Sequence, residues 1–153
     1  RVAYESDRGT WNIMQLHPRD MDAAFLEVDW DEQADMQGNW QPAGGLDWVD
    51  SARGTAISGI TGLELSGTDP HRLADHWSRV LGQPVQSHNG LPAIPLANAL
   101  LRFSYGEASR DHGLTGVDLA VPDPADIVGR ASDRGLPSWR NGFRLGGVRF
   151  TCE

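Results

Sequence analysis

Apolar residues alternate with small or polar residues in two stretches of the chain that resemble each other. The alternating apolar positions are Leu63 and Leu65 in the first stretch and Val117 and Leu119 in the second. A period of two is typical of a β-strand that buries one face. The stretches belong to residues 59–70 and 113–124, which align without a gap 54 positions apart. The pattern therefore predicts one supersecondary unit used twice.

An Asp-Pro pair follows each predicted strand and indicates the start of a helix. Asp69 suits the N-cap, and Pro70 suits the first helical position, where its missing N–H costs nothing. Apolar residues then recur at helical spacing, at Leu73, Trp77, Val80 and Leu81 in the first copy and, more thinly, at Ile127, Val128 and Ala131 in the second. Gly82 and Gly135 are expected to end the helices.

Short strands are predicted after each helix. They lie around 84–87, 92–97 and 99–105 in the first copy, and around 136–139, 142–145 and 147–152 in the second. Each repeat is thus a strand, a helix and about three strands. We expect the repeats to span about 55–108 and 109–153, and to form one paired βαβββ module over 55–153.

Residues 1–30 do not repeat this beginning. They predict two strands, about 10–17 and 23–30, which resemble the last two strands of a preceding repeat. Residues 31–54 are polar and rich in Gly, Asp and Trp, and are interpreted as a linker. The unpaired strand edges should pair with the sheet of 55–153, with a second chain or with a lost N-terminal region.

Composition narrows the function classes. The 153 residues include 21 acidic and 13 basic side chains, all of the latter Arg, for a net charge of −8. This balance argues against a nucleic-acid or anionic-membrane partner, and the absence of Lys excludes lysine-based catalysis. No apolar run approaches the roughly 20 residues that cross a bilayer. With Cys152 as the single cysteine and no signal peptide, we expect a cytoplasmic protein.

Two short motifs carry a resemblance to a known family. Residues 77–84, Trp-Ser-Arg-Val-Leu-Gly-Gln-Pro, combine an aromatic residue with a Leu-Gly helix end, and residues 16–20 with 25–28 read as a closing hairpin. Together with the tandem βαβββ pattern, these segments resemble the vicinal oxygen chelate superfamily, which includes glyoxalase I, bleomycin-resistance proteins, extradiol dioxygenases and methylmalonyl-CoA epimerase. The chain looks most similar to uncharacterised bacterial glyoxalase-like proteins built from four repeats. The resemblance implies an α+β fold, with a curled, cup-shaped mixed sheet and helices on its outer face.

The resemblance also implies where a divalent metal would bind, and this sequence lacks the usual ligands there. The first-strand positions fall on Gly62 and Gly116, and the last-strand positions fall near Phe103 and Phe150. Only Glu27 keeps the family's carboxylate, and it is a weak metal candidate. We therefore expect no metal and no other cofactor in 55–153, with a divalent metal ion as the alternative. The five histidines are scattered, and we interpret them as surface residues.

Strand alternation places Glu64 and Asp118 on the concave face at equivalent positions of the two repeats. One hypothesis is that they form a catalytic general acid/base pair, or grip a cationic or hydrogen-bonding ligand. The alternative is that each bonds a neighbouring arginine, Arg102 or Arg149, or lies in solvent.

The remaining candidates are ligand-binding residues. Trp139 follows a predicted turn and could form the lip of a pocket, as one of six tryptophans in the chain. The other candidates on the last strands are Phe103, Phe150, Arg102 and Arg149.

Three functions remain open from these residues. The first is a glyoxalase-like protein that binds a small organic ligand in the sheet cup without a metal. The second is a lyase, isomerase or epimerase. It would either depend on a metal held by Glu27 and residues of another region or chain, or use Glu64 and Asp118 without metal. The third is a scaffold for a dimer. The expected partners are a small molecule and either a second copy of the chain or the rest of a four-repeat protein.

Overall fold

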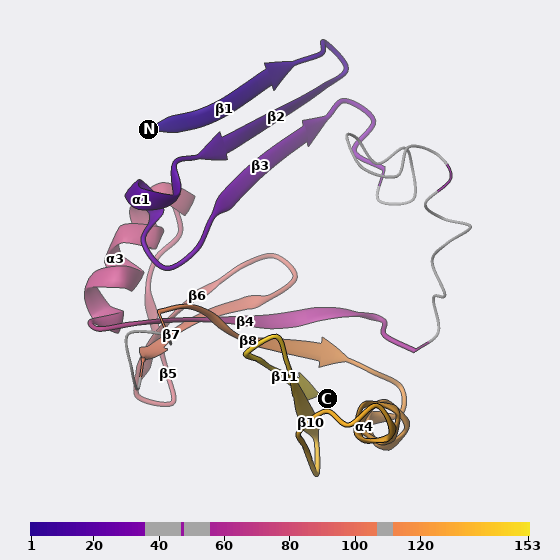
Figure 1. The fold of residues 1–153 in the computed structure, drawn as a ribbon. Coiled ribbons are helices and arrows are strands. Elements are labelled where there is room, and N and C mark those ends of the chain that lie inside the picture. Colours follow the sequence, from indigo (N-terminus) through magenta and orange to yellow (C-terminus); the bar gives the residue numbers. More distant parts are fainter. Residues whose placement is uncertain (36–46, 48–55, 107–111) are drawn as a thin grey trace. The chain divides into compact units, whose positions relative to one another are not determined.

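The computed structural model describes residues 1–35, 47, 56–106 and 112–153. Most of the linker expected over 31–54 therefore lies outside the described residues. The chain divides into an N-terminal unit, Arg1–Gly54, and a C-terminal unit, Thr55–Glu153 (Figure 1). Each unit is described by itself below.

The N-terminal unit is an antiparallel sheet in the order β1-β2-β3. Its elements are β1 (Val2–Asp7), β2 (Trp11–Leu16), the short helix α1 (Pro18–Met21) and β3 (Leu26–Asp31). The sequence predicted two strands here and missed β1. The residues of β1 are nearly all exposed, so the strand has no apolar alternation to reveal it, and its backbone pairing with β2 defines it instead.

Strand β3 separates apolar from acidic residues by simple alternation. Leu26, Val28 and Trp30 fall on one face, and Glu27, Asp29 and Asp31 fall on the other. Val28 and Trp30 stay about half exposed. Although Asp29 is an exposed residue, some desolvation raises the pKa of its carboxyl group, and the nearby Glu27 carboxylate raises it further.

The C-terminal unit contains two copies of the predicted βαβββ repeat. The first repeat consists of β4 (Gly59–Gly67), α3 (Pro70–Leu81), β5 (Gln86–His88), β6 (Leu91–Pro95) and β7 (Leu100–Tyr105). The second repeat consists of β8 (Gly113–Ala120), α4 (Pro124–Asp133), β9 (Ser138–Trp139), β10 (Gly142–Leu145) and β11 (Val148–Cys152).

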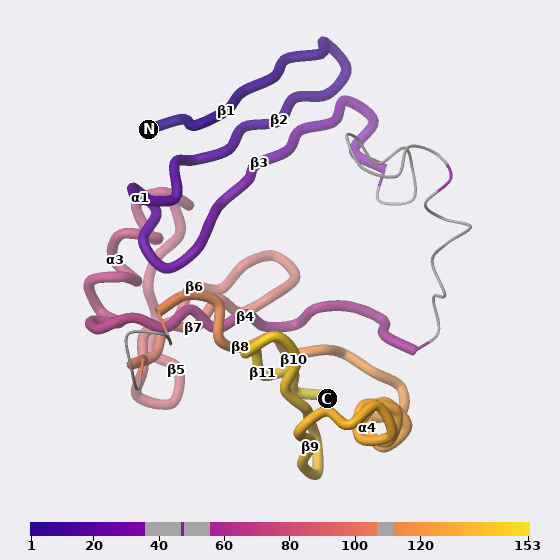
Figure 2. The backbone as a smooth tube through the Cα atoms, in the orientation of Figure 1, coloured from indigo at the N-terminus to yellow at the C-terminus, as the bar shows by residue number. Residues whose placement is uncertain are grey.

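The two repeats share one mixed sheet in the order β5-β6-β7-β4-β8-β11-β10-β9. The first strands β4 and β8 pair antiparallel at its centre, and each runs parallel to the last strand of its own repeat, β7 or β11. Figure 2 traces the backbone of this unit from β4 in magenta to β11 in yellow. This order is symmetric about the β4–β8 pair. The expected α+β class with a curled, mixed sheet is confirmed.

Both helices begin as the Asp-Pro pairs predict. The Asp69 side chain accepts hydrogen bonds from the backbone N–H groups of His71 and Arg72, at 3.1 and 3.0 Å. Asp123 does the same for α4. Gly82 ends α3 in the left-handed conformation, with φ of 66°, which a glycine adopts without strain.

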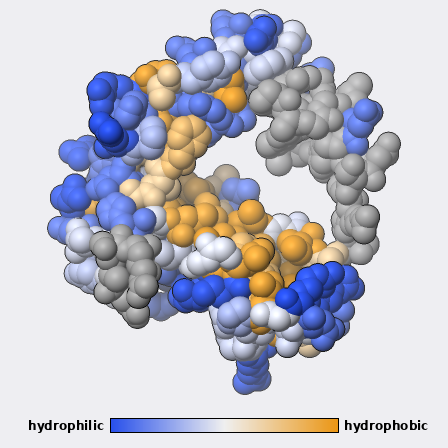
Figure 3. All heavy atoms as spheres, viewed as in Figure 1, coloured by the Kyte–Doolittle hydropathy of each residue, from blue (hydrophilic) through white to orange (hydrophobic). Residues whose placement is uncertain are grey.

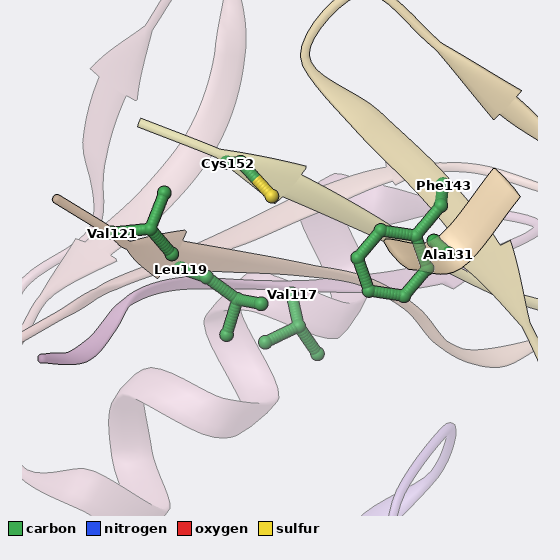
Figure 4. Close-up of a cluster of buried hydrophobic side chains, with 6 residues drawn as sticks. All are labelled: Val117, Leu119, Val121, Ala131, Phe143 and Cys152. Carbon is green, nitrogen blue, oxygen red and sulfur yellow. The ribbon is translucent and has the colours of Figure 1, made fainter. Parts of the chain in front are cut away.

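The core lies between the helices and the sheet. On the first repeat it contains the α3 residues Leu73 and Trp77 together with Ile94 and Phe103 of the strands, all nearly inaccessible to solvent. On the second repeat it consists of Val117, Leu119, Val121, Ala131, Phe143 and Cys152 (Figure 4). The space-filling view shows apolar residues over the strands of this unit and polar residues over α4 (Figure 3). The opposite face of the sheet is left for the polar residues of β4, β7, β8 and β11.

Candidate functional site

A cavity of about 330 Å³ opens on the polar face of the C-terminal sheet. Charged side chains dominate its lining: Glu64, Asp118, Glu153, Arg102 and Arg149. Four of them come from the last strand of each repeat and from the central strands β4 and β8, and Glu153 directly follows β11. The cavity is therefore built around the symmetry axis of the duplicated unit.

Strand register explains how these charges meet. Arg102, Glu64, Gly116 and Arg149 stand opposite one another in one row across four adjacent strands. Gly62, Asp118 and Thr151 form the next row. Glycine thus occupies the equivalent position of β4 and of β8, and a carboxylate follows two residues later on each strand.

Each arginine pairs with a carboxylate of the other repeat. Arg102 donates from Nη1 to Oδ2 of Asp118, and both side chains are largely buried, with exposed fractions of 21% and 12%. Arg149 donates from Nη2 to Oε2 of Glu64 over 2.9 Å. Of the two alternatives drawn from the sequence for Glu64 and Asp118, bonding to neighbouring arginines is what the geometry displays. Whether they also act on a ligand stays a prediction.

The two glycines leave the space that these ion pairs occupy. A Cβ atom at Gly62 would collide with the Asp118 carboxylate and lie 2.7 Å from Nη1 of Arg102. A Cβ at Gly116 would lie 3.1 Å from Cβ of Glu64 and 3.2 Å from Nη2 of Arg149. Any larger side chain at Gly62 would displace the ion pair, so the glycine is a packing requirement of this cup.

Hydroxyl groups complete the surroundings of Glu64. Ser104 donates to Oε1 of Glu64 over 3.1 Å, and Thr115 lies 3.4 Å from the same oxygen. The buried Ser66 joins the two, with contacts of 2.7 Å to Ser104 and 2.6 Å to Thr115. Both oxygens of Glu64 therefore accept hydrogen bonds from the protein.

The Asp118 end of the cup is built differently. Ala120 stands where the first repeat has Ser66, so the chain of hydroxyl groups is interrupted. Thr61, the equivalent of Thr115, instead donates to Oε1 of Glu153. The two repeats thus share one backbone arrangement, but they surround Glu64 and Asp118 with different hydrogen-bonding groups.

This donor set does not fit a divalent metal ion. Glycine at both first-strand positions offers no ligand, and the carboxylates that remain are held by guanidinium groups, whose positive charge repels a cation. Within residues 1–35, 56–106 and 112–153, no three His, Cys, Asp or Glu side chains gather as a metal site would require. Glu27 lies exposed on β3, where its carboxylate accepts a hydrogen bond from Gln15. That the protein works without a metal stays a prediction.

Of the predicted ligand-binding residues, Arg102, Arg149 and Phe103 line the cavity, and Phe150 and Trp139 do not. Phe103 borders it, but its exposed fraction is 0%, and Phe150 stacks on Phe143 with ring centroids 5.2 Å apart. Successive strand residues point to opposite faces, so placing Arg102 and Arg149 in the cup turns the neighbouring phenylalanines into the core. Trp139 lies at the sheet edge in β9, against Gly142, and is not part of the cavity lining.

The sequence analysis missed several lining residues. His88 and Asn89 come from the β5–β6 hairpin, and Ser104, Thr151 and Glu153 continue the alternation that begins at the two arginines. The Asn-Gly pair at 89–90, with φ of 52° and 80°, is a hairpin-turn signal that was available in the sequence. Extending the strand alternation in steps of two residues predicts Ser104 from Arg102, and Thr151 and Glu153 from Arg149.

No helix of the described residues is long and apolar enough to cross a membrane. This agrees with the hydropathy of the sequence.

A scan against models of protein families finds no match, and neither does a search of curated protein sequences. Solved structures do match. A hypothetical protein from Staphylococcus aureus shares 12% identity at a TM-score of 0.62, over 100% of this chain and 56% of its own. Methylmalonyl-CoA epimerase from Mycobacterium tuberculosis shares 13% identity at a TM-score of 0.45, over 65% of this chain and 89% of its own.

The methylmalonyl-CoA epimerase of Streptomyces coelicolor shares 9% identity at a TM-score of 0.43, over 63% of this chain and 96% of its own. The whole of this chain aligns with the Staphylococcus protein, and it spans little more than half of that protein's length. At these identities the likeness concerns the fold alone.

Proposed function

Because the chain has the fold of the vicinal oxygen chelate superfamily, we propose that its C-terminal unit binds a small organic molecule in the sheet cup without a metal. The observation that carries this proposal is the cavity of about 330 Å³ on the concave face. Its volume lies at the small end of the range of about 300–1,000 Å³ typical of ligand pockets. Its walls supply hydrogen-bonding groups where a metal centre would need free carboxylates and imidazoles.

The chemistry of the wall favours a polar ligand over a flat aromatic one. Arginine, carboxylate and hydroxyl groups line the cavity. The rings of Phe103 and Phe150 pack into the core, and Trp139 lies at the sheet edge. Directional hydrogen bonds from such groups orient a ligand and set its specificity. A sequestration or sensing protein needs only a cavity that binds its ligand. The same holds for the binding half of a longer enzyme.

A metal-dependent lyase, isomerase or epimerase would need Glu27 and further ligands from outside the described residues. Glu27 lies in the N-terminal unit, engaged with Gln15, and no contact in the described residues favours this alternative. Metal content separates the two proposals directly.

The first experiment is elemental analysis of the purified protein, followed by a thermal-shift screen against a library of small polar organic compounds. We expect no stoichiometric divalent metal, and at least one compound that raises the melting temperature by mass action. Stoichiometric Fe, Mn, Ni or Zn, or a library without any stabilising compound, would overturn the proposal.

A matched pair of variants locates the binding site. Thr151→Val removes a hydroxyl group from the cavity lining without touching either ion pair, whereas Thr68→Val makes the same change at an exposed position outside the lining. Weaker binding in Thr151→Val and unchanged binding in Thr68→Val is the expected result. Equal binding by both variants would place the ligand elsewhere.

A further inference from the structure

We propose that the ligand of the cup is a small zwitterion, with one anionic and one cationic group, as in a free amino acid. This inference rests on the proposed function and adds the chemical class of the ligand. It follows from which hydrogen-bonding atoms of the charged wall are already used and which are not.

The two cations of the wall retain donors. A guanidinium group carries five N–H bonds in a planar fork. Among the residues that the structure describes, Arg102 hydrogen-bonds through Nη1 and Arg149 through Nη2. Arg149 is also the more accessible of the two, with 41% of its side chain exposed. Its remaining N–H groups suit a carboxylate, which guanidinium binds in a bidentate manner.

The anions of the wall retain acceptors in the same way. Asp118 accepts through Oδ2 and Glu153 through Oε1, so Oδ1 of Asp118 and Oε2 of Glu153 accept no hydrogen bond from the described part of the chain. Glu64 differs, because both of its oxygens are used. An ammonium group with three N–H donors would match the two remaining oxygens.

Strand β11 and the residue that follows it display both kinds of group in order. Arg149, Thr151 and Glu153 line the cavity at alternate positions of the chain, so one wall runs from a cation through a hydroxyl to an anion. Asp118 stands opposite Thr151 on the neighbouring strand β8. The carboxylates with an unused oxygen, those of Asp118 and Glu153, therefore lie at the Asp118 end of the cup, beyond the row that holds Arg149.

The total charge of the wall favours a ligand without net charge. Two guanidinium groups face three carboxylates, so a purely anionic ligand meets an excess of negative charge, and a purely cationic one meets two arginines. Desolvating either kind of ion without a partner is costly. A zwitterion brings one partner for each kind of group and leaves the Arg102–Asp118 and Arg149–Glu64 pairs intact.

The test uses free amino acids and their derivatives. Calorimetric titration with each of the twenty L-amino acids identifies one that binds, and its N-acetyl and carboxamide derivatives then each remove one charge. We expect both derivatives to bind at least about tenfold more weakly, the loss of one charge-assisted hydrogen bond. In Arg149→Met the amino acid and its carboxamide should bind equally, whereas Arg79→Met, at an exposed position of α3, should keep the difference.

Three results would overturn the inference. Derivatives that bind as tightly as the parent show that the charges are not recognised. Uncharged library compounds that bind in the cup when no amino acid does would refute the zwitterion and leave the proposed function standing. Failure of both amino acids and library compounds to bind would refute the proposed function itself. The derivative series is measured on the unaltered protein, so it stays decisive if Arg149→Met fails to fold.

Discussion

Arg102 on the last strand of the first repeat hydrogen-bonds Asp118 on the first strand of the second repeat. The reciprocal pair, Arg149 with Glu64, runs in the opposite direction between the same repeats. Each arginine side chain extends across the neighbouring strand to its carboxylate partner. Arg102 crosses β4 beside Gly62, and Arg149 crosses β8 beside Gly116. The two repeats are thus joined at the cup by two reciprocal ion pairs.

Gly62→Ala should destabilise the protein by about 1–3 kcal/mol, the usual cost of overpacking a filled site. The new Cβ would collide with the Asp118 carboxylate and crowd Nη1 of Arg102, so the ion pair would have to move. Urea denaturation measures the change. Gly129→Ala in α4 is the matched control, because its Cβ meets nothing within 4 Å and it should stabilise the helix by roughly 0.5–1 kcal/mol. Equal stability of Gly62→Ala and the unaltered protein would contradict this account of the cup.

Arg102→Met should lower the free energy of unfolding more than the removal of both Arg102 and Asp118 does. The single change leaves the largely buried Asp118 carboxylate without its cation, at a cost of about 1–3 kcal/mol. Arg102→Met combined with Asp118→Leu removes that unpaired charge and should recover part of the loss. A double-mutant cycle by urea denaturation checks this.

The exposed pair between Arg130 and Asp126 on α4 provides the comparison, with side chains 61% and 44% exposed. Arg130→Met should change the stability by less than about 0.5 kcal/mol, as surface pairs usually do. A strictly additive cycle at Arg102 and Asp118 would mean that their contact contributes nothing to the fold.

The repeated βαβββ frame could be predicted because its signals are local. The strand alternation and the Asp-Pro caps lie within a few residues of the positions that they specify, and the duplication presents each signal twice. Strand β1 escaped prediction because Glu5, Ser6 and Asp7 give it no apolar stripe. Its existence depends on a partner strand, which a local pattern does not contain.

The site could be predicted only in part, because it depends on contacts across strands. Glu64 and Asp118 were placed on the concave face correctly by alternation alone. The glycines at 62 and 116 were interpreted as lost metal ligands, whereas they make room for side chains that arrive from other strands. Phe150 is absent from the cavity lining and stacks on Phe143, because it is adjacent to an arginine that faces the cup and so faces the other way. Phe103 borders the cavity although it is fully buried, and its role in ligand binding stays a prediction.

Cys152 should react slowly with thiol reagents in the folded protein. The side chain is 3% exposed, and burial raises the pKa of its thiol, which lowers the fraction of reactive thiolate at pH 8. Reaction with Ellman's reagent in rising urea should follow the unfolding of β11. A native protein that reacts as fast as free cysteine would show that this end of the sheet opens readily.

Asp29 on β3 should titrate at a higher pH than an aspartate of the unfolded chain. Some desolvation raises its pKa, and the neighbouring Glu27 carboxylate raises it further. The folded state therefore holds this proton more tightly than the unfolded state does. The stability that the protonated form contributes is present at low pH, and it is lost as the pH rises from the unfolded pKa through the folded one.

Two substitutions separate these causes. Glu27→Gln removes the neighbouring charge and should lower the titration midpoint of Asp29, which the carboxyl carbon resonance reports by NMR. Because desolvation is the larger cause, the midpoint should stay above that of an aspartate in the unfolded chain. Asp29→Asn should abolish this part of the pH dependence of unfolding and leave the protein more stable at pH 7. An Asp29 resonance that titrates as an exposed aspartate in the unaltered protein would contradict both expectations.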